Sequence, residues 1–107
     1  MKRLILAALF LTIATSSAHA DGMHINGDSR YGCADKDYYN KTVQISAQND
    51  LEAFKKVLGA GLATGMCVMF EAGEPVHVVD AGFLMSKIRR QGDVAEYWIE
   101  TQILSRN

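Results

Sequence analysis

The clearest hydrophobic pattern in the chain lies between residues 51 and 65. Apolar residues recur there at spacings of three and four, namely Leu51, Phe54, Val57, Leu58 and Leu62. Asp50 precedes the run as a good N-cap, and glycines near the other end, Gly65 last, weaken and end a helix. The pattern predicts an amphipathic helix that begins after Asp50 and ends near Gly65.

A second helix is expected over residues 33–48. Asp35 suits the N-cap, and Asp37 places negative charge in the first turn, where the helix dipole favours it. Three β-branched residues, Thr42, Val43 and Ile45, are also compatible with a strand, so the choice between helix and strand stays open here.

From residue 66 onward the apolar residues follow strand-like patterns. Short apolar segments lie at 66–70, 76–79, 84–90 and 95–100, with turns at 72–75 and 91–93 between them. Residues 101–104 fit either one helical turn or a last strand. Four or five short strands at this spacing predict a small antiparallel barrel or a strongly bent sheet.

Residues 21–32 are polar and glycine-bearing and show no apolar period. They predict a flexible lead-in to a single small domain over residues 33–107, helical in 33–65 and β in 66–104.

The β half resembles the Src homology 3-like barrels of bacterial proteins. The residues that carry the resemblance are Gly73, Val76 and Val78, then Lys87-Ile88-Arg89-Arg90 with Gly92, then Tyr97-Trp98-Ile99, with Leu104 closing. The resemblance covers residues 66–104. It implies an α+β fold, in which one or two N-terminal helices precede a small antiparallel barrel of four to five strands. Members of that family bind peptides, cell-wall fragments or proteins and are seldom enzymes. The aromatic residues of the eukaryotic peptide groove have no clear counterpart here.

The N-terminal residues predict export. Lys2 and Arg3 precede an apolar run over 4–14, and Ala18-His19-Ala20 is a typical signal-peptidase site. Cleavage before Asp21 would remove residues 1–20 and send the protein to the periplasm or the medium. The remaining chain contains no apolar run near eighteen residues, so we expect no membrane span.

Two cysteines remain after the leader, Cys33 and Cys67. An even number of cysteines in a small exported domain predicts a disulfide, worth roughly 3.5–4 kcal/mol in the chain-entropy model. A redox-active pair is less favoured, because the spacing is not C-x-x-C and neither cysteine has an obvious activating base beside it.

Charge argues against nucleic acid as a partner. The chain has eleven basic and twelve acidic residues, and two of the basic ones, Lys2 and Arg3, belong to the leader. The mature chain is therefore mildly acidic, whereas nucleic-acid binding needs clustered positive charge.

The residues best suited to contact a partner are Lys87, Arg89, Tyr97 and Trp98. Alternation in residues 84–90 places Lys87 and Arg89 on one face with Ile88 opposite. It also places Tyr97 and Trp98 on opposite faces, so only one of the two can belong to the core. A basic and aromatic surface suits a protein, a peptide or an anionic cell-envelope glycan.

No catalytic residues are predicted, and no metal or cofactor is expected. His77 and Asp80 are three apart in an expected strand, which places them on opposite faces, and Glu71 and Glu74 flank a turn. The chain lacks the nucleophile-elbow, phosphate-loop and paired-histidine motifs. We therefore expect a non-catalytic binding protein, such as an inhibitor, an immunity factor, an accessory protein or a virulence-type factor. The rival reading is a small secreted hydrolase or thiol-active enzyme.

Overall fold

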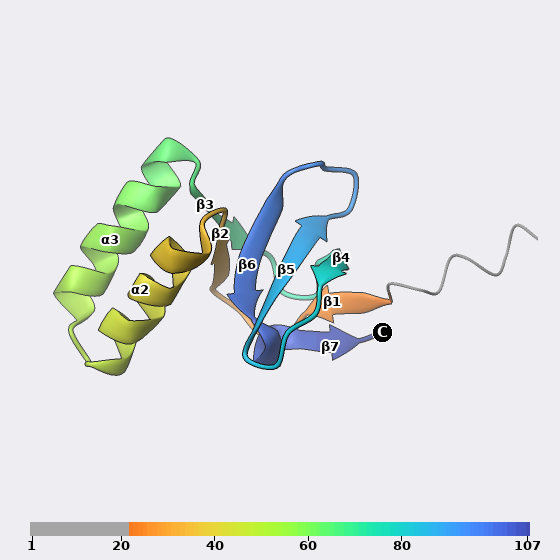
Figure 1. Ribbon diagram of the computed structural model, residues 1–107, viewed down its shortest axis with the longest axis horizontal. Coiled ribbons are helices and arrows are strands. Elements are labelled where there is room, and N and C mark those ends of the chain that lie inside the picture. The colour runs from red at the N-terminus through yellow and green to blue at the C-terminus, as the bar shows by residue number, and fades with distance from the viewer. Residues whose placement is uncertain (1–21) are drawn as a thin grey trace, which may run out of the picture.

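The fold is described from a computed structural model of the chain, and the description covers residues 22–107 (Figure 1). The expected leader lies outside the described residues.

The described residues form two helices, one 3₁₀ turn and seven strands. In chain order these are β1 (Met23–Ile25), β2 (Arg30–Cys33), α2 (Lys36–Ala47), α3 (Leu51–Thr64), β3 (Cys67–Phe70), β4 (Pro75–Asp80), β5 (Met85–Arg90), β6 (Glu96–Glu100), η3 (Thr101–Ile103) and β7 (Leu104–Arg106). The strands make one sheet in the order β3-β2-β6-β5-β4-β1-β7. Every neighbouring pair in it is antiparallel.

The α+β class is as expected, but the prediction of a closed barrel with four to five strands is wrong. The sheet has seven strands and is open, with β3 and β7 at its two edges. Residues 101–104 were compatible with one helical turn or with a last strand. The structure contains both, since the 3₁₀ turn η3 is followed directly by the strand β7.

The two additional strands lie in the segment that was expected to be a flexible lead-in. β1 inserts between β4 and β7, and β2 between β3 and β6, so both are interior strands of the sheet. Gly32 in β2 explains why the segment reads as a loop. A Cβ atom at Gly32 would lie 2.9 Å from both Ile99 and Phe70, so close packing requires glycine where strand propensity disfavours it.

Both helices begin and end where local signals place them. The side chain of Asp35 accepts a hydrogen bond from the N–H of Asp37, and that of Asp50 accepts one from Ala53. Gly65 ends α3 in the left-handed conformation, with φ at 82°. Residues 36–47 are therefore helical, which resolves the choice between helix and strand.

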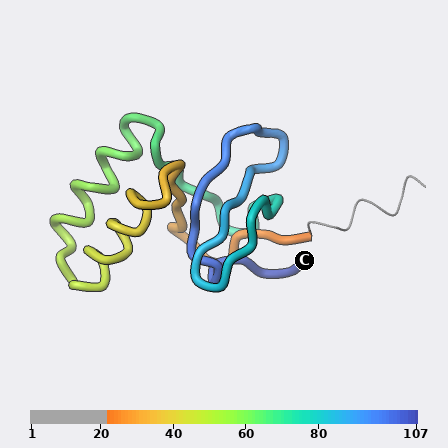
Figure 2. Tube along the Cα trace, viewed as in Figure 1, coloured from red at the N-terminus to blue at the C-terminus, as the bar shows by residue number. Residues whose placement is uncertain are grey.

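The sheet bends around one hydrophobic core. Its buried members come from β1, β3, β4, β5, β6 and η3, namely Ile25, Phe70, Val76, Ile88, Tyr97, Ile99 and Ile103. Phe70 lies on an edge strand and Ile25 near the opposite edge, so their shared core shows that the sheet curls. The tube in Figure 2 shows this curl, with the helices beyond one end of the sheet.

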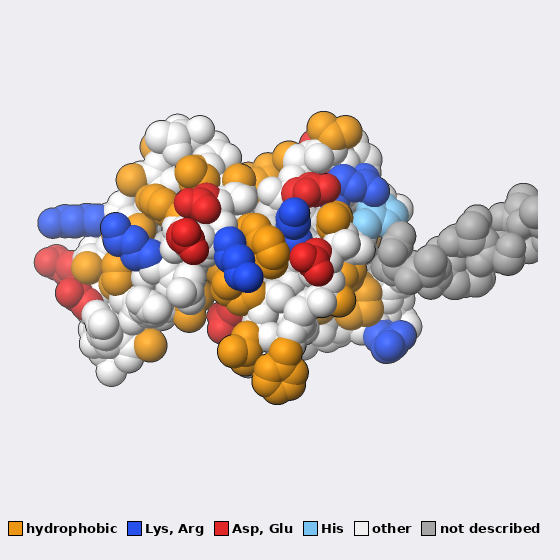
Figure 3. All heavy atoms as spheres, in the orientation of Figure 1, with side chains coloured by type: hydrophobic (Ala, Val, Ile, Leu, Met, Phe, Trp, Pro, Cys, Tyr) orange, Lys and Arg blue, Asp and Glu red, His pale blue; other side chains and the backbone are white. Residues whose placement is uncertain are grey.

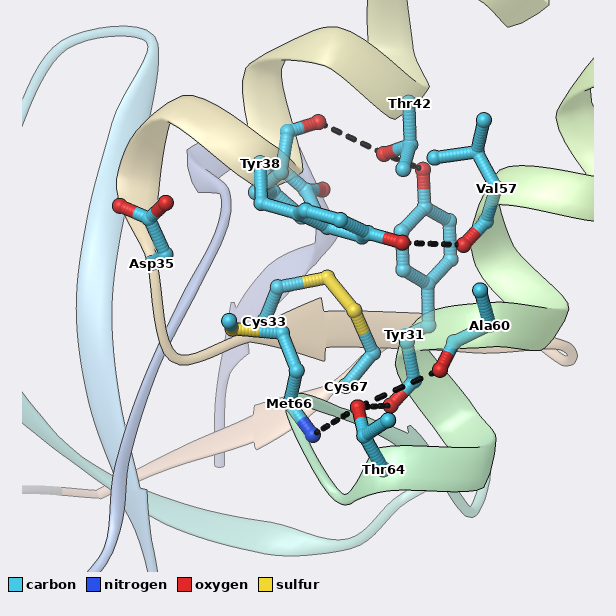
Figure 4. Close-up of a disulfide and its surroundings, with 12 residues drawn as sticks. Tyr31, Cys33, Asp35, Tyr38, Thr42, Val57, Ala60, Thr64, Met66 and Cys67 are labelled. Atoms are coloured by element: carbon cyan, nitrogen blue, oxygen red, sulfur yellow. Dashed lines mark hydrogen bonds between the residues drawn. A yellow bond between two sulfur atoms is a disulfide. The ribbon is translucent and has the colours of Figure 1, made fainter.

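A second core joins the helices to the sheet. It is formed by Tyr39 and by Cys33 and Cys67, which are bonded in a disulfide. Cys33 and Cys67 are paired directly across β2 and β3, at the entrance and exit of the helical hairpin. Figure 4 shows the disulfide beside the helices, with the Tyr38 hydroxyl donating to the carbonyl of Val57 in α3 at 2.6 Å. The disulfide thus closes the base of the hairpin.

Candidate functional site

Trp98 is the centre of the candidate site. It lies on β6 and is half-buried against the disulfide core. Lys87 is its direct partner across β5 and β6, and the Lys87 Nζ lies 5.4 Å from the centroid of the indole ring. Lys36, in the first turn of α2, reaches the same ring with its Nζ at 4.8 Å from the centroid. One tryptophan therefore carries two ammonium groups within cation–π distance.

The structure brings together two of the four residues named from the sequence. Lys87 and Trp98 are adjacent, with Ile88 buried beneath the sheet as the alternation predicts. Tyr97 is not at this surface, because it belongs to the core and packs edge-on against Phe70 with ring centroids 6.2 Å apart. Trp98 is the aromatic residue that faces outward.

Arg89 shares the outer face with Lys87, but its side chain is engaged elsewhere. Its guanidinium donates to the carbonyl of Asp93 at 2.8 Å, which ties it to the β5–β6 turn. The next residue, Arg90, donates to Glu74 at 2.7 Å and to the carbonyl of Met69. The side chains of both arginines therefore bond to the protein itself.

Lys36, the second cation of the site, was not predicted from the sequence. It is separated from Trp98 by 62 residues, so no local pattern links the two positions.

The charge at the site is partly balanced on one side. Lys87 also lies 3.5 Å from a carboxylate oxygen of Glu96, at a position where both side chains are partly exposed. An exposed pair of this kind contributes little to stability and exchanges readily with a competing anion. Lys36 forms no ion pair with any residue in the range 22–107, so the two lysines together present net positive charge over the ring.

A hydrophobic loop lies beside this site. Phe83 and Leu84, between β4 and β5, are 93% and 74% exposed. Figure 3 shows hydrophobic side chains in the middle of the visible face and at its lower edge, with basic side chains among them.

Two adjoining clefts separate the loop from α2. The larger, of about 440 Å³, is lined by Lys36, Asn40, Gly82, Phe83, Leu84 and Met85. The smaller, of about 220 Å³, is lined by Asn40, Val43, Phe83, Leu84, Met85, Glu100 and Gln102. Lys36 is thus common to the tryptophan site and to the larger cleft.

Hydrogen bonds hold the backbone of the loop in place. Ser86 is buried, and its hydroxyl accepts from the N–H of Gly82 at 3.2 Å and pairs with the Thr101 hydroxyl at 2.7 Å. Thr101 in turn donates its hydroxyl to the carbonyl of Gly82 and its N–H to the carbonyl of Leu84, both at 2.9 Å. The loop therefore presents its two apolar side chains from a fixed backbone.

His77 and Asp80, the first acid–base pair considered from the sequence, do not lie on opposite faces of β4. A β-bulge between Val78 and Asp80 shifts the register, so His77 is paired with Arg89 and Asp80 with Lys87. His77 and Asp80 consequently share one face, and the expectation of opposite faces is wrong because the bulge breaks the alternation.

The second pair, Glu71 and Glu74, lies in the β3–β4 turn and serves its structure. Glu74 accepts from the N–H of Glu71 at 3.0 Å and from Arg90. Both cysteines are at most 2% exposed, which shields the disulfide from an attacking thiolate.

Residues 22–107 contain no helix that is long and apolar enough to cross a membrane. Within the same residues, no three or more His, Cys, Asp or Glu side chains are grouped to hold a metal ion.

Comparison with protein-family models, with curated proteins and with solved structures finds no match to this chain. The resemblance to Src homology 3-like proteins accordingly stays a prediction from the sequence.

Proposed function

We propose that this chain is an exported, non-catalytic binding protein that acts in the periplasm or outside the cell. Its contact site is Trp98 with Lys36 and Lys87, and its partner is a protein, a peptide or a cell-envelope glycan that carries an anionic group. The observation that carries the proposal is the convergence of two ammonium groups on one partly exposed indole ring.

The chemistry of these three side chains is that of binding. An indole ring offers a flat apolar surface for a sugar ring or a side chain. Because a tryptophan side chain has few rotatable bonds, it loses little conformational entropy on contact. The two ammonium groups supply charge for a carboxylate, sulfate or phosphate group beside that surface. The cross-strand pairing of Lys87 with Trp98, and the start of α2 at Lys36, set the backbone positions from which both lysines reach the ring.

The exported setting is supported by two features. The leader predicted over residues 1–20 is of the secretory type. The Cys33–Cys67 disulfide is of a kind that persists in oxidising compartments. No specific observation favours the rival reading of a hydrolase or a thiol-active enzyme.

The experiment uses Trp98, which is the single tryptophan of the chain, as its own reporter. The disulfide-intact protein is titrated with poly-glutamate and with polygalacturonate while indole fluorescence is recorded, and dextran serves as a neutral control. We expect a saturable change with at least one acidic polymer, weaker in 1 M salt than in 0.1 M salt, and no change with dextran.

A matched pair of variants separates the site from net charge. K36Q/K87Q and K55Q/K56Q remove the same charge, but Lys55 and Lys56 lie exposed on α3. We expect the first variant to lose at least about tenfold in affinity, about 1.4 kcal/mol, and the second to bind nearly as the wild type does. Equal losses in both variants, or no response to either acidic polymer, would contradict the proposal.

A further inference from the structure

The loop of Phe83 and Leu84 is the most exposed pair of adjacent large apolar side chains among the described residues. Apolar surface gains roughly 25 cal/mol for each Å² removed from water, so exposure of both side chains is unfavourable. Exposed apolar patches of this kind mark interaction surfaces. The proposed binding site at Trp98 does not include these two side chains, so it does not explain their exposure.

The loop is built for contact without rearrangement. Gly82 permits the tight turn, since a Cβ atom there would clash with the carbonyl oxygen of Met85. Ser86 and Thr101 hydrogen-bond the backbone at Gly82 and Leu84. Because these backbone groups are already paired, covering the loop leaves none of them unsatisfied, and little entropy is lost on binding.

The patch combines a protruding ring with a hollow next to it. Both clefts are lined by Asn40, Phe83, Leu84 and Met85, and Phe83 is the most exposed of the large apolar residues there. A surface with a knob beside a hollow can pair with a copy of itself, because a two-fold axis sets each knob against the other copy's hollow.

The charges at the two ends of the patch have opposite sign. Lys36 lines the cleft at one end, and Glu100 lines the cleft at the other end, with Asn40 common to both. An antiparallel two-fold arrangement therefore places Lys36 of one copy against Glu100 of the second. A uniformly charged patch would repel its copy, whereas this one is electrostatically complementary to itself.

We infer that this surface, Phe83 and Leu84 with the adjoining clefts, binds a second copy of this chain in an antiparallel two-fold dimer. Two exposed side chains and their surroundings cover less than the ~800 Å² per partner of a standard stable interface. The dimer is accordingly weak and reversible, with a dissociation constant on the order of 10–100 μM. This inference does not rest on the proposed binding of an anionic partner.

The first test is sedimentation equilibrium of the disulfide-bonded protein, leader removed, from about 5 μM to 1 mM. We expect the average mass to rise from monomer toward dimer. F83S should remain monomeric throughout. V94S should associate like the wild type, because Val94 is also highly exposed, at 89%, but lies in the β5–β6 turn, at the other end of β5 from Phe83. A wild-type protein that stays monomeric at 1 mM, or equal association of F83S, would overturn the inference. A larger assembly than a dimer would overturn the two-fold arrangement.

A charge exchange tests the antiparallel arrangement. K36E and E100K should each weaken association at least about tenfold, because like charges then face each other across the axis. The double variant K36E/E100K restores opposite charges and should restore the dimer. A double variant as monomeric as the singles, with its circular dichroism unchanged, would contradict the pairing.

Titration of F83S with the acidic polymers keeps the two proposals apart. We expect F83S to bind them as the wild type does, since Phe83 carries no charge and is not one of the three side chains of the indole site. The experiments can thus contradict the dimer while they support anion binding, or contradict anion binding while they support the dimer.

Discussion

Gly61 of α3 lies directly against the disulfide sulfur of Cys67. A Cβ atom at Gly61 would be 2.5 Å from the Cys67 Sγ and 3.1 Å from the ring of Tyr38. The helix can approach the sheet this closely only because position 61 has no side chain. In the sequence, Gly61 is a residue that weakens a helix and Cys67 is a cysteine in an expected strand. In the structure the two residues pack against each other.

We predict that G61A destabilises the protein even though alanine favours helices. The added methyl group must displace a sulfur atom that its bond to Cys33 holds in place, and overpacking of this kind costs typically 1–3 kcal/mol. The gain of up to about 1 kcal/mol in helix propensity offsets only part of that cost. Chemical denaturation at pH 7 measures the difference.

G59A is the matched control. Gly59 is exposed on the same helix, and a Cβ atom there meets nothing within 4 Å. We expect G59A to raise the free energy of unfolding by about 0.5–1 kcal/mol. If G61A were stabilising to the same extent as G59A, the close contact with the disulfide would be ruled out.

The helices were predictable because their limits are set by local chemistry. Asp35 and Asp50 cap their own first turns, and Gly65 ends α3 with a positive φ. Such signals lie within four residues of what they determine, so a single sequence contains them in full.

The sheet was predicted only in part, because its limits are set by distant contacts. β5 and β6 were recognised by their alternation, whereas β1 and β2 are only three and four residues long and form because their neighbours pair with them. The number of strands, and hence an open sheet in place of a barrel, depends on these two segments.

The candidate site follows the same division. Lys87 and Trp98 were found because each faces outward from its own strand. Lys36 reaches the same ring from the start of α2, and no pattern of spacing links the two positions. The loop at Phe83 was missed for the same reason, since Thr101, which holds its backbone, lies beyond the end of the neighbouring strand β6.

We predict that Arg90 holds the curled sheet together. From β5 it pairs with Glu74, donates to the carbonyl of Met69 on the edge strand β3, and lies over the ring of Phe70 at 4.9 Å. R90A should lower the free energy of unfolding by about 1–2 kcal/mol, since charge-assisted bonds are worth about 1.5–3 kcal/mol and this side chain is partly exposed.

Hydrogen exchange gives the local counterpart of that prediction. Loss of Arg90 should speed exchange of the β3 amides at 67–70 more than that of the α3 amides, because the free edge of the sheet loses its cover. R106A, an exposed arginine at the end of β7, serves as the control and should change neither measurement. Uniform loss of protection in R90A would argue against a role specific to β3.

The last prediction concerns Tyr39, which connects α2 to the end of β6. Its side chain is 2% exposed, and its hydroxyl accepts a hydrogen bond from the backbone N–H of Glu100 at 2.8 Å. Burial raises the pKa of Tyr39 well above its ordinary value of 10.0. Burial also raises the pKa of Tyr31, whose hydroxyl pairs with Thr42.

These shifts make stability depend on alkaline pH with a definite sign. Above pH 10 the unfolded chain releases the proton of Tyr39 while the folded chain keeps it, so the unfolded state binds fewer protons. The stability that neutral Tyr39 contributes is therefore complete below pH 10 and is lost as the pH rises toward the folded-state pKa. The loss from this one group approaches about 1.4 kcal/mol per pH unit.

Y39F separates this effect from general alkaline denaturation. At pH 8 the variant should be less stable than the wild type by about 1–3 kcal/mol, because the buried N–H of Glu100 loses its acceptor. The variant cannot ionise at position 39, so the difference should shrink as the pH rises from 10 to 11. Guanidinium chloride denaturation of both proteins at pH 8, 10 and 11 provides the measurement. A difference that stays constant across these three pH values would show that Tyr39 ionises as readily in the folded protein as in the unfolded chain, against the burial seen here.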